Sequence, residues 1–205
     1  MATKVVRVDP IAPDDALLRE AADVLRRGGL VAFPTETFYG LGAAALDSAA
    51  VRRVFDVKGR PSSMPLLVLL DTASSLRHVV LDVPPHARPL MDLHWPGALT
   101  LVFRAAPHLP AELTAGTGTV GVRVPGHQVP RALVSHLGVP VTGPSANPSG
   151  GAPPTTAADV LAHFGDVLDL LLDGGPTPGG APSTVVDVTV DPPRVLRQGA
   201  ITLRL

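Results

Sequence analysis

The stretch LVAFPTETFYGLG, residues 30–42, joins a short apolar run to a loop that carries polar side chains. Leu30 to Phe33 is apolar throughout and predicts a strand. The proline and the two glycines of residues 34–42 favour a shaped loop over a continued strand. Residues 139–151 repeat the arrangement, because a short strand pattern there leads into GPSANPSGG. Strands that end in such loops are typical of α/β sheets, which bind ligands beyond their strand ends.

Around these two segments, short apolar runs alternate with amphipathic helical patterns, so we expect an α/β domain built on one large sheet. The predicted helices cover residues 13–27, 48–58, 72–79, 85–93, 128–137 and 156–164. Ser48 is the expected cap of the second helix, and Gly59 is expected to end it. The predicted strands are 5–8, 30–33, 65–70, 99–103, 120–124, 139–142, 168–172, 183–188 and 194–197.

Length and composition narrow the class of protein. A chain of 205 residues predicts a single domain over residues 1–205. The absence of cysteine excludes disulfides, thiolate nucleophiles and cysteine-ligated metals. The N-terminal residues lack a signal-peptide pattern and no apolar run is long enough to span a membrane, so a cytoplasmic protein is expected. The net charge of −1 gives no overall attraction for nucleic acid.

The KGRP segment, residues 58–61, is followed by Ser62 and Ser63 and gathers charge and hydroxyls at the end of a helix. Lys58 is one of only two lysines, and a helix C-terminus alone explains one positive side chain. Two cations around a glycine also suit a polyphosphate, because lysine supplies a compact charge and arginine a planar fork.

Other candidate positions allow two interpretations each. SANPSGG, residues 145–151, would either admit a ligand close to the backbone or form an ordinary turn, and neither a Walker A nor a GxGxxG pattern is present. Thr35, Glu36, Thr37 and Tyr39 would line a pocket or only turn a corner. Arg123 lies in an apolar strand and needs a partner, either a bound carboxylate or an internal Asp or Glu. The seven histidines form no HxxxH or HExxH pattern, which argues against a protein-ligated metal.

In their order along the chain, eight segments resemble the YrdC-like family, and specifically its L-threonylcarbamoyladenylate synthases, from about residue 28 to residue 201. They are PTETFYGLG, KGRP, PLLVLL, HWPGALTLVF, VGVRVPGH, SANPSG, APSTVVDV and RVLRQGAI. The resemblance implies a twisted mixed sheet with flanking helices and a concave basic cavity. It also implies the formation of threonylcarbamoyl-AMP and pyrophosphate from L-threonine, bicarbonate and ATP, with Mg²⁺ held through the ATP phosphates. Separate proteins would then transfer the threonylcarbamoyl group to a tRNA adenosine.

The resemblance also assigns site residues. The family's phosphate-side signature falls on Lys58, Arg60, Ser145 and Asn147, a set that the related YciO-like branch lacks, and Lys58 and Arg60 are the expected catalytic cations. The expected ATP-binding residues are Lys58, Ser62, Thr119, Ser145, Asn147 and Arg197, with Pro153 as a further position. The expected L-threonine-binding residues are Thr35, Leu67, Arg123, Gly143 and Ser183, and no protein ligand for a metal is expected.

Two positions depart from the family pattern: Leu69 stands where many members have a polar residue, and Gly143-Pro144 replaces an Ala or Thr before the Ser-x-Asn. Because the sequence ends at Leu205, the extra C-terminal domain of longer members is expected to be absent. The alternative function is an RNA- or tRNA-binding module of the same fold without catalysis. A weak tRNA contact is compatible with either function, and no membrane partner is expected.

Overall fold

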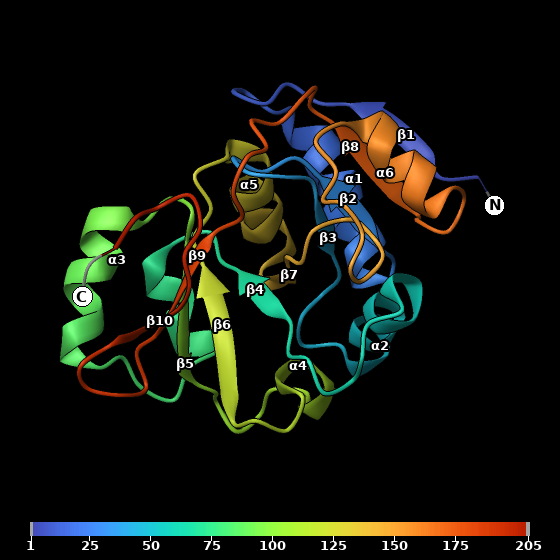
Figure 1. Cartoon of the computed structure of the whole chain (residues 1–205). Coiled ribbons are helices and arrows are strands. Elements are labelled where there is room, and N and C mark those ends of the chain that lie inside the picture. The colour runs from blue at the N-terminus through green and yellow to red at the C-terminus, as the bar shows by residue number, and fades with distance from the viewer. Residues whose placement is uncertain (1, 204–205) are drawn as a thin grey trace.

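The computed structural model describes residues 2–203, in which mixed β-sheets carry helices on their faces (Figure 1). One sheet has four strands, of which three neighbouring strands are parallel and the fourth, at one edge, is antiparallel to its neighbour. In spatial order the strands are β1 (Lys4–Arg7), β8 (Leu170–Asp173), β2 (Val31–Phe33) and β3 (Gly40–Gly42). The stretch predicted as a loop after residue 33 therefore ends in a strand.

The second sheet has six strands and mixed directions, with β9 parallel to β5, β6 parallel to β4, and the other neighbours antiparallel. In spatial order the strands are β10 (Arg194–Arg197), β9 (Thr184–Asp187), β5 (Leu99–Arg104), β6 (Thr119–Arg123), β4 (Leu67–Leu69) and β7 (Val141–Thr142). The predicted α/β class with mixed strand directions is confirmed.

The single large sheet of the prediction is divided into two between β3 and β7. Backbone hydrogen bonds still join the flanks of these strands, from Thr142 N to Ala43 O at 2.9 Å and from Leu41 N to Pro144 O at 2.8 Å. Pro140 directly precedes the two-residue strand β7 and Pro144 follows two residues after it. Neither has an N–H to donate, which disfavours regular pairing on either side of the strand. The sequence pattern does not reveal this interruption because it depends on which strands meet.

Most helices lie close to their predicted ranges. They are α1 (Asp15–Arg26), α2 (Ser48–Lys58), α3 (Arg88–His94), α5 (Gln128–Leu137) and α6 (Ala157–Phe164). The range 72–79 is a 3₁₀ helix, Ala73–His78, and a second 3₁₀ turn, Pro85–Ala87, precedes α3. The short helix α4 (Ala111–Thr114) was not predicted.

The bounds of α2 decide where the KGRP segment sits. Asp47, rather than the predicted Ser48, caps this helix, since its side chain accepts from the N–H groups of Ala49 and Ala50. Gly59 ends it as predicted, with a positive φ of 55° that glycine adopts without strain. Lys58 is therefore the last residue of the helix, and Arg60 begins the segment that leads to β4.

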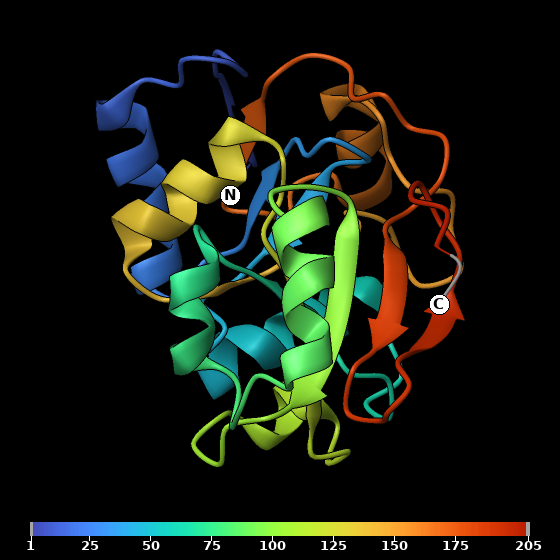
Figure 2. The same cartoon turned by 90° about the vertical axis from the view of Figure 1, so that its left-hand side faces the viewer.

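The apolar core extends across both sheets. One buried cluster joins Leu41 and Leu171 of the four-stranded sheet to Val68, Leu101 and Val122 of the six-stranded sheet. A second cluster fills the space beneath α1 and α5, which lie side by side in Figure 2. In the described part of the chain, no helix is long and apolar enough to cross a membrane.

Candidate functional site

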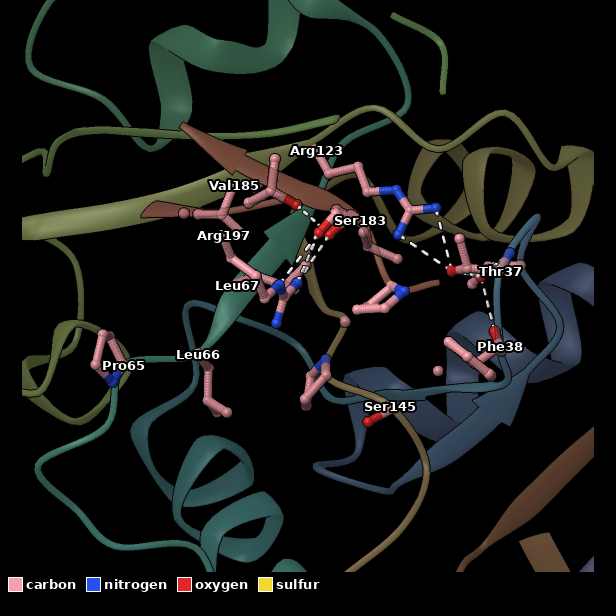
Figure 3. Close-up of a pocket in the computed structure, with 18 of the residues that line it drawn as sticks. Thr37, Phe38, Pro65, Leu66, Leu67, Arg123, Ser145, Ser183, Val185 and Arg197 are labelled. Atoms are coloured by element: carbon pink, nitrogen blue, oxygen red, sulfur yellow. Dashed lines mark hydrogen bonds between the residues drawn. The ribbon is translucent and has the colours of Figure 1, made fainter. Parts of the chain in front are cut away.

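A cavity of about 350 Å³ lies on one face of the six-stranded sheet (Figure 3). Side chains alternate between the two faces of a strand, so every second residue of β4, β5 and β6 reaches this face. The residues concerned are Leu67, Leu69, Thr100, Val102, Thr119, Gly121 and Arg123. Gly121 leaves the cavity floor without a side chain at this position. A Cβ atom there would lie 3.4 Å from Thr100 Cγ2.

Loops from strand ends form the walls of the cavity. The loop after β2 contributes Thr35, Thr37 and Phe38, and the loop after β7 contributes residues 143–145. The segment between α2 and β4 adds Arg60 and residues 65–66, and the segment just before β9 adds residues 182–183. The two loops that the sequence analysis singled out, after residues 33 and 142, therefore face one cavity across the sheet edge.

Arg123 reaches the cavity from the end of β6 and is only 5% exposed. Of its two possible partners, the structure contains the internal one: Nη2 lies 2.6 Å from Oε1 of Glu36. Its Nε donates to the carbonyl oxygen of Gly97 at 3.1 Å, and Nη1 and Nη2 both lie 3.5 Å from Thr37 Oγ1. A buried guanidinium with an ion-pair partner is far less costly than an unpaired one.

Glu36 is held from two sides. Its Oε1 also accepts the backbone N–H of Gly126 at 2.7 Å, while Oε2 is buried and has no hydrogen-bond partner in the described residues. Burial by itself raises the pKa of Glu36, but the charge of Arg123 and the hydrogen bonds from Gly126 and Arg123 outweigh it and bring the pKa below its ordinary value. Glu36 is therefore a carboxylate at neutral pH.

Lys58 lies behind the loop after β7 rather than among the cavity-lining residues. It is 3% exposed, and its Nζ donates to the carbonyl oxygens of Ser145 and Asn147. Burial, followed by the charge of Arg60, lowers the pKa of Lys58 to about 8. These hydrogen bonds directly connect the two segments that carry the phosphate-side signature, and they hold the loop after β7 in place.

The other signature residues differ in position. Arg60 lines the cavity and donates to the carbonyls of Met64 at 3.1 Å and Pro65 at 2.8 Å, and burial lowers its pKa. Ser145 also lines the cavity. Asn147 is buried and shapes the turn after it, since Nδ2 donates to the carbonyls of Pro148 and Gly151 at 2.8 and 2.9 Å.

Ser183 and Arg197 form a polar group on the opposite wall (Figure 3). Arg197 Nη2 donates to Ser183 O at 2.8 Å, and Ser183 Oγ lies 2.8 Å from Thr100 Oγ1. Burial, followed by the charge of Arg123, lowers the pKa of Arg197. Thr35 is fixed differently, because its Oγ1 donates to Phe38 O at 2.7 Å within the loop after β2.

The structure brings most of the sequence-predicted site residues together. Those that line the cavity are Thr35, Arg60, Leu67, Thr119, Arg123, Gly143, Ser145, Ser183 and Arg197. Lys58 and Asn147 lie behind its wall, and Ser62 and Pro153 are exposed outside the lining. Sequence reasoning missed Thr100, although it is the one hydroxyl inside the otherwise apolar strand LTLVF.

Among residues 2–203, the charged side chains that line the cavity are all positive. Arg60, Arg123 and Arg197 line it, and no Asp or Glu does so among residues 2–203. Within the same range, no group of three or more His, Asp or Glu residues could hold a metal ion. A concave site with guanidinium donors, hydroxyls and an apolar floor is suited to an anionic small molecule.

Comparison with known proteins agrees with this geometry. A family model, Sua5_yciO_yrdC, described as "Telomere recombination", matches residues 23–199. The chain is 43% identical over 186 residues to threonylcarbamoyl-AMP synthase of Pyrococcus abyssi. The aligned region covers 91% of this chain and 55% of that protein. The chain spans about half the length of the first curated relatives that it matches.

Two solved structures share the fold. Sua5 of Pyrococcus abyssi complexed with L-threonine has a TM-score of 0.92 and 41% identity, covering 96% of this chain and 58% of that one. Escherichia coli YciO has a TM-score of 0.88 and 27% identity, covering 97% of this chain and 96% of that one. The resemblance stated from the sequence motifs is thereby confirmed at the level of sequence and of fold. The chain belongs to the Sua5/YciO/YrdC family.

Proposed function

We propose that this chain is a nucleotidyltransferase that makes threonylcarbamoyl-AMP and pyrophosphate from L-threonine, bicarbonate and ATP. The observation that carries the proposal is the cavity, in which three arginines and several hydroxyls face one space of about 350 Å³. The greater identity to a threonylcarbamoyl-AMP synthase, 43%, than to YciO, 27%, favours the synthase branch of the family.

The proposed reaction has two bond-forming steps. The amine nitrogen of threonine bonds to the carbon of bicarbonate and water leaves, which gives an N-carboxylate. An oxygen of this carboxylate then attacks the α-phosphorus of ATP, and the bond to pyrophosphate breaks. Because both reactants are anions, the protein has to bring them together with positive charge and exclude water, rather than form a covalent intermediate.

The positions of the cavity residues suggest which reactant each one binds. In this proposal Arg123 would bind the threonine carboxylate, and the hydroxyls of Thr35 and Ser183, which line the same cavity, would bind its amine or hydroxyl group. Leu67 and Gly143 lie side by side at the floor, where Gly143 N donates to Leu67 O at 3.0 Å, and present backbone and apolar surface to the same molecule.

The nucleotide is assigned to the remaining cationic wall. Arg60 and Arg197 would contact its phosphates, with Thr119 and Ser145 as hydroxyl partners. Lys58 and Asn147 serve these contacts by holding the loop that carries Ser145. Ser62 is exposed outside the lining, so it would contact a nucleotide only if the nucleotide extends beyond the lining residues.

Magnesium is proposed to arrive on the nucleotide. The cavity lining among residues 2–203 contains no carboxylate, so the ATP phosphates and water are the oxygen ligands that Mg²⁺ prefers here. The ion supplies neutralisation of phosphate charge when it is bound. Arg60 and Arg197 would add to that neutralisation from the protein side.

The product of the proposed reaction is a mixed anhydride, which must be passed on before water destroys it. Separate transfer proteins, acting on a tRNA adenosine, are the proposed recipients, in the cytoplasm where ATP and tRNA are both present. A weak tRNA contact is compatible with this order of events. The alternative of an RNA-binding module without catalysis explains less, because Arg123 and Ser183 are buried in the cavity rather than spread over a surface.

The decisive experiment is pyrophosphate release by the purified protein with ATP, Mg²⁺ and bicarbonate, with and without L-threonine. We expect release only when threonine and bicarbonate are both present. Arg123→Ala is the matched variant and should abolish the threonine-dependent release of pyrophosphate. Release that ignores threonine, or no release combined with salt-sensitive RNA binding, would contradict the proposal.

A further inference from the structure

The contacts of Arg123 leave only part of its guanidinium free. A guanidinium has five N–H donors in a fixed plane. Nε donates to Gly97 O at 3.1 Å and Nη2 is 2.6 Å from Glu36 Oε1, so two of its nitrogens are already held by the protein. These two contacts fix the orientation of the guanidinium plane of Arg123.

The donors that remain face Thr37, which lines the cavity. Nη1 and Nη2 both lie 3.5 Å from Thr37 Oγ1, at the outer limit for a hydrogen bond. This fork between the two terminal nitrogens is the side on which a carboxylate binds arginine through both of its oxygens. In Figure 3 the guanidinium of Arg123 points toward Thr37 along the edge of the cavity.

Glu36 is itself fixed in place. It lies between Thr35 and Thr37 in the loop after β2, and its Oε1 accepts Gly126 N at 2.7 Å from the turn that follows β6. The carboxylate thus connects the strand that carries Arg123 to the loop that carries two cavity hydroxyls. It is not among the residues that line the cavity.

We infer that Glu36 is a positioning residue for the recognition of the amino-acid carboxylate. It fixes the plane of Arg123 so that the fork between the two terminal nitrogens, which has only the 3.5 Å contacts to Thr37 Oγ1, faces the cavity. The inference rests on the proposed function and identifies the step that Glu36 serves. Glu36 is also an anion and competes with the substrate for Arg123. Orientation outweighs this competition because Glu36 engages only one terminal nitrogen and because its removal leaves the guanidinium with the contact from Nε to Gly97 O and the two 3.5 Å contacts to Thr37 Oγ1.

The test compares Glu36→Ala and Glu36→Gln in the pyrophosphate assay, with separate KM values for threonine and ATP. Glu112→Ala is the matched control, since Glu112 pairs with Arg52 outside the cavity. We expect Glu36→Ala to raise the KM for threonine by roughly 10- to 100-fold, the scale of losing one member of a buried charge pair. Glu36→Gln keeps an oxygen for Gly126 and Arg123 and should lose less. The KM for ATP should stay near the wild-type value.

A second substrate separates positioning from general damage. L-Threoninamide lacks the carboxylate, so the wild-type preference for threonine over threoninamide measures carboxylate recognition. We expect this preference to shrink in Glu36→Ala, while the thermal midpoint by circular dichroism shows that the variant is folded. If the alanine variant does not fold, the same comparison is made with Glu36→Gln. An unchanged preference, a lower KM for threonine, or an equal rise in the KM values for threonine and ATP would overturn the inference.

Failure of the proposed function is distinguishable from failure of this inference. If the wild-type protein releases no threonine-dependent pyrophosphate, the proposed reaction is wrong. Calorimetric titration with L-threonine and L-threoninamide then decides the role of Glu36 on its own. Threonine binding that the wild type shows and Glu36→Ala weakens supports the inference, and absence of threonine binding to the wild type overturns it as well.

Discussion

The cations of the candidate site are of two kinds that differ in what they contact. Arg60, Arg123 and Arg197 present donors to the cavity, whereas Lys58 donates to the carbonyls of Ser145 and Asn147. Arginine suits the first task because it stays charged and binds anions through two donors, and lysine suits the second because its compact ammonium reaches several carbonyls at once. Residues that one motif places together are therefore expected to give different mutant phenotypes.

Arg60→Ala should lower the turnover number by about 100-fold or more, the scale of removing a contact that stabilises charge in a transition state. Arg60 is only partly buried and hydrogen-bonds to the nearby carbonyls of Met64 and Pro65, so folding should persist. Pyrophosphate release measures the effect. Arg52→Ala, on the exposed side of α2, is the control, and near-normal activity of Arg60→Ala would remove Arg60 from the phosphate site.

Lys58 makes the stability of the unliganded protein depend on pH. Its folded pKa of about 8 lies below the ordinary 10.5, so between these values the unfolded chain binds more protons and the free energy of unfolding rises with pH. From pH 8 to pH 9 the wild type should gain about 1 kcal/mol relative to Lys58→Met. Urea unfolding of both proteins at each pH measures this difference, in which other titrating groups cancel. A constant difference would mean that the lysine titrates at its ordinary pKa.

At the scale of elements, Leu69 of β4 packs directly against Gly143, the residue that follows β7. A Cβ atom on Gly143 would lie 2.6 Å from Leu69 Cγ, which is closer than nonbonded carbon atoms approach. Both residues are those that the resemblance marked as departures from the family pattern, and in this structure they lie against each other. A larger side chain at one position requires space at the other.

A double-mutant cycle on this pair should show strong coupling. Gly143→Ala is expected to lose about 1–3 kcal/mol by overpacking, and Leu69→Ala about 2–5 kcal/mol by leaving a cavity. The double variant should lose clearly less than the sum, because each change relieves the defect of the other. Urea denaturation measures all four proteins. Additive losses would show that the leucine does not rest on the glycine in solution.

The sequence predicted best what local patterns determine. The bounds of β10 and the end of α2 at Gly59 depend on residues close in the chain and agree with the structure. The four-residue helix α4 is too short to show a period. The partner of Arg123 could not be chosen, because Glu36 meets it only after β2 and β6 have folded into different sheets. Likewise, the sequence could not predict that the Lys58 side chain points to the loop after β7, because its acceptor Ser145 O is distant in the chain.

At the scale of the whole molecule, two sheets share one core, so we expect them to unfold together. Cluster members from both sheets are in mutual contact, and backbone hydrogen bonds join β3 to β7. Far-UV circular dichroism and the fluorescence of Trp95, the sole tryptophan, should therefore give the same urea midpoint. Trp95 lies beside Phe103 of the six-stranded sheet and reports on that half. Separate midpoints would show that the sheets are independent folding units.

The burial of Lys58 also affects whether its amine can react with the product that we propose for this site. An activated acyl phosphate reacts with free amines, and a lysine facing such a product would be carbamoylated by it. Guanidinium groups remain protonated and are poor nucleophiles. Among residues 2–203, the cavity lining contains Arg60, Arg123 and Arg197 but no lysine, and Lys58 donates to two carbonyl oxygens behind the wall, so the lining presents no amine to the mixed anhydride proposed to form there.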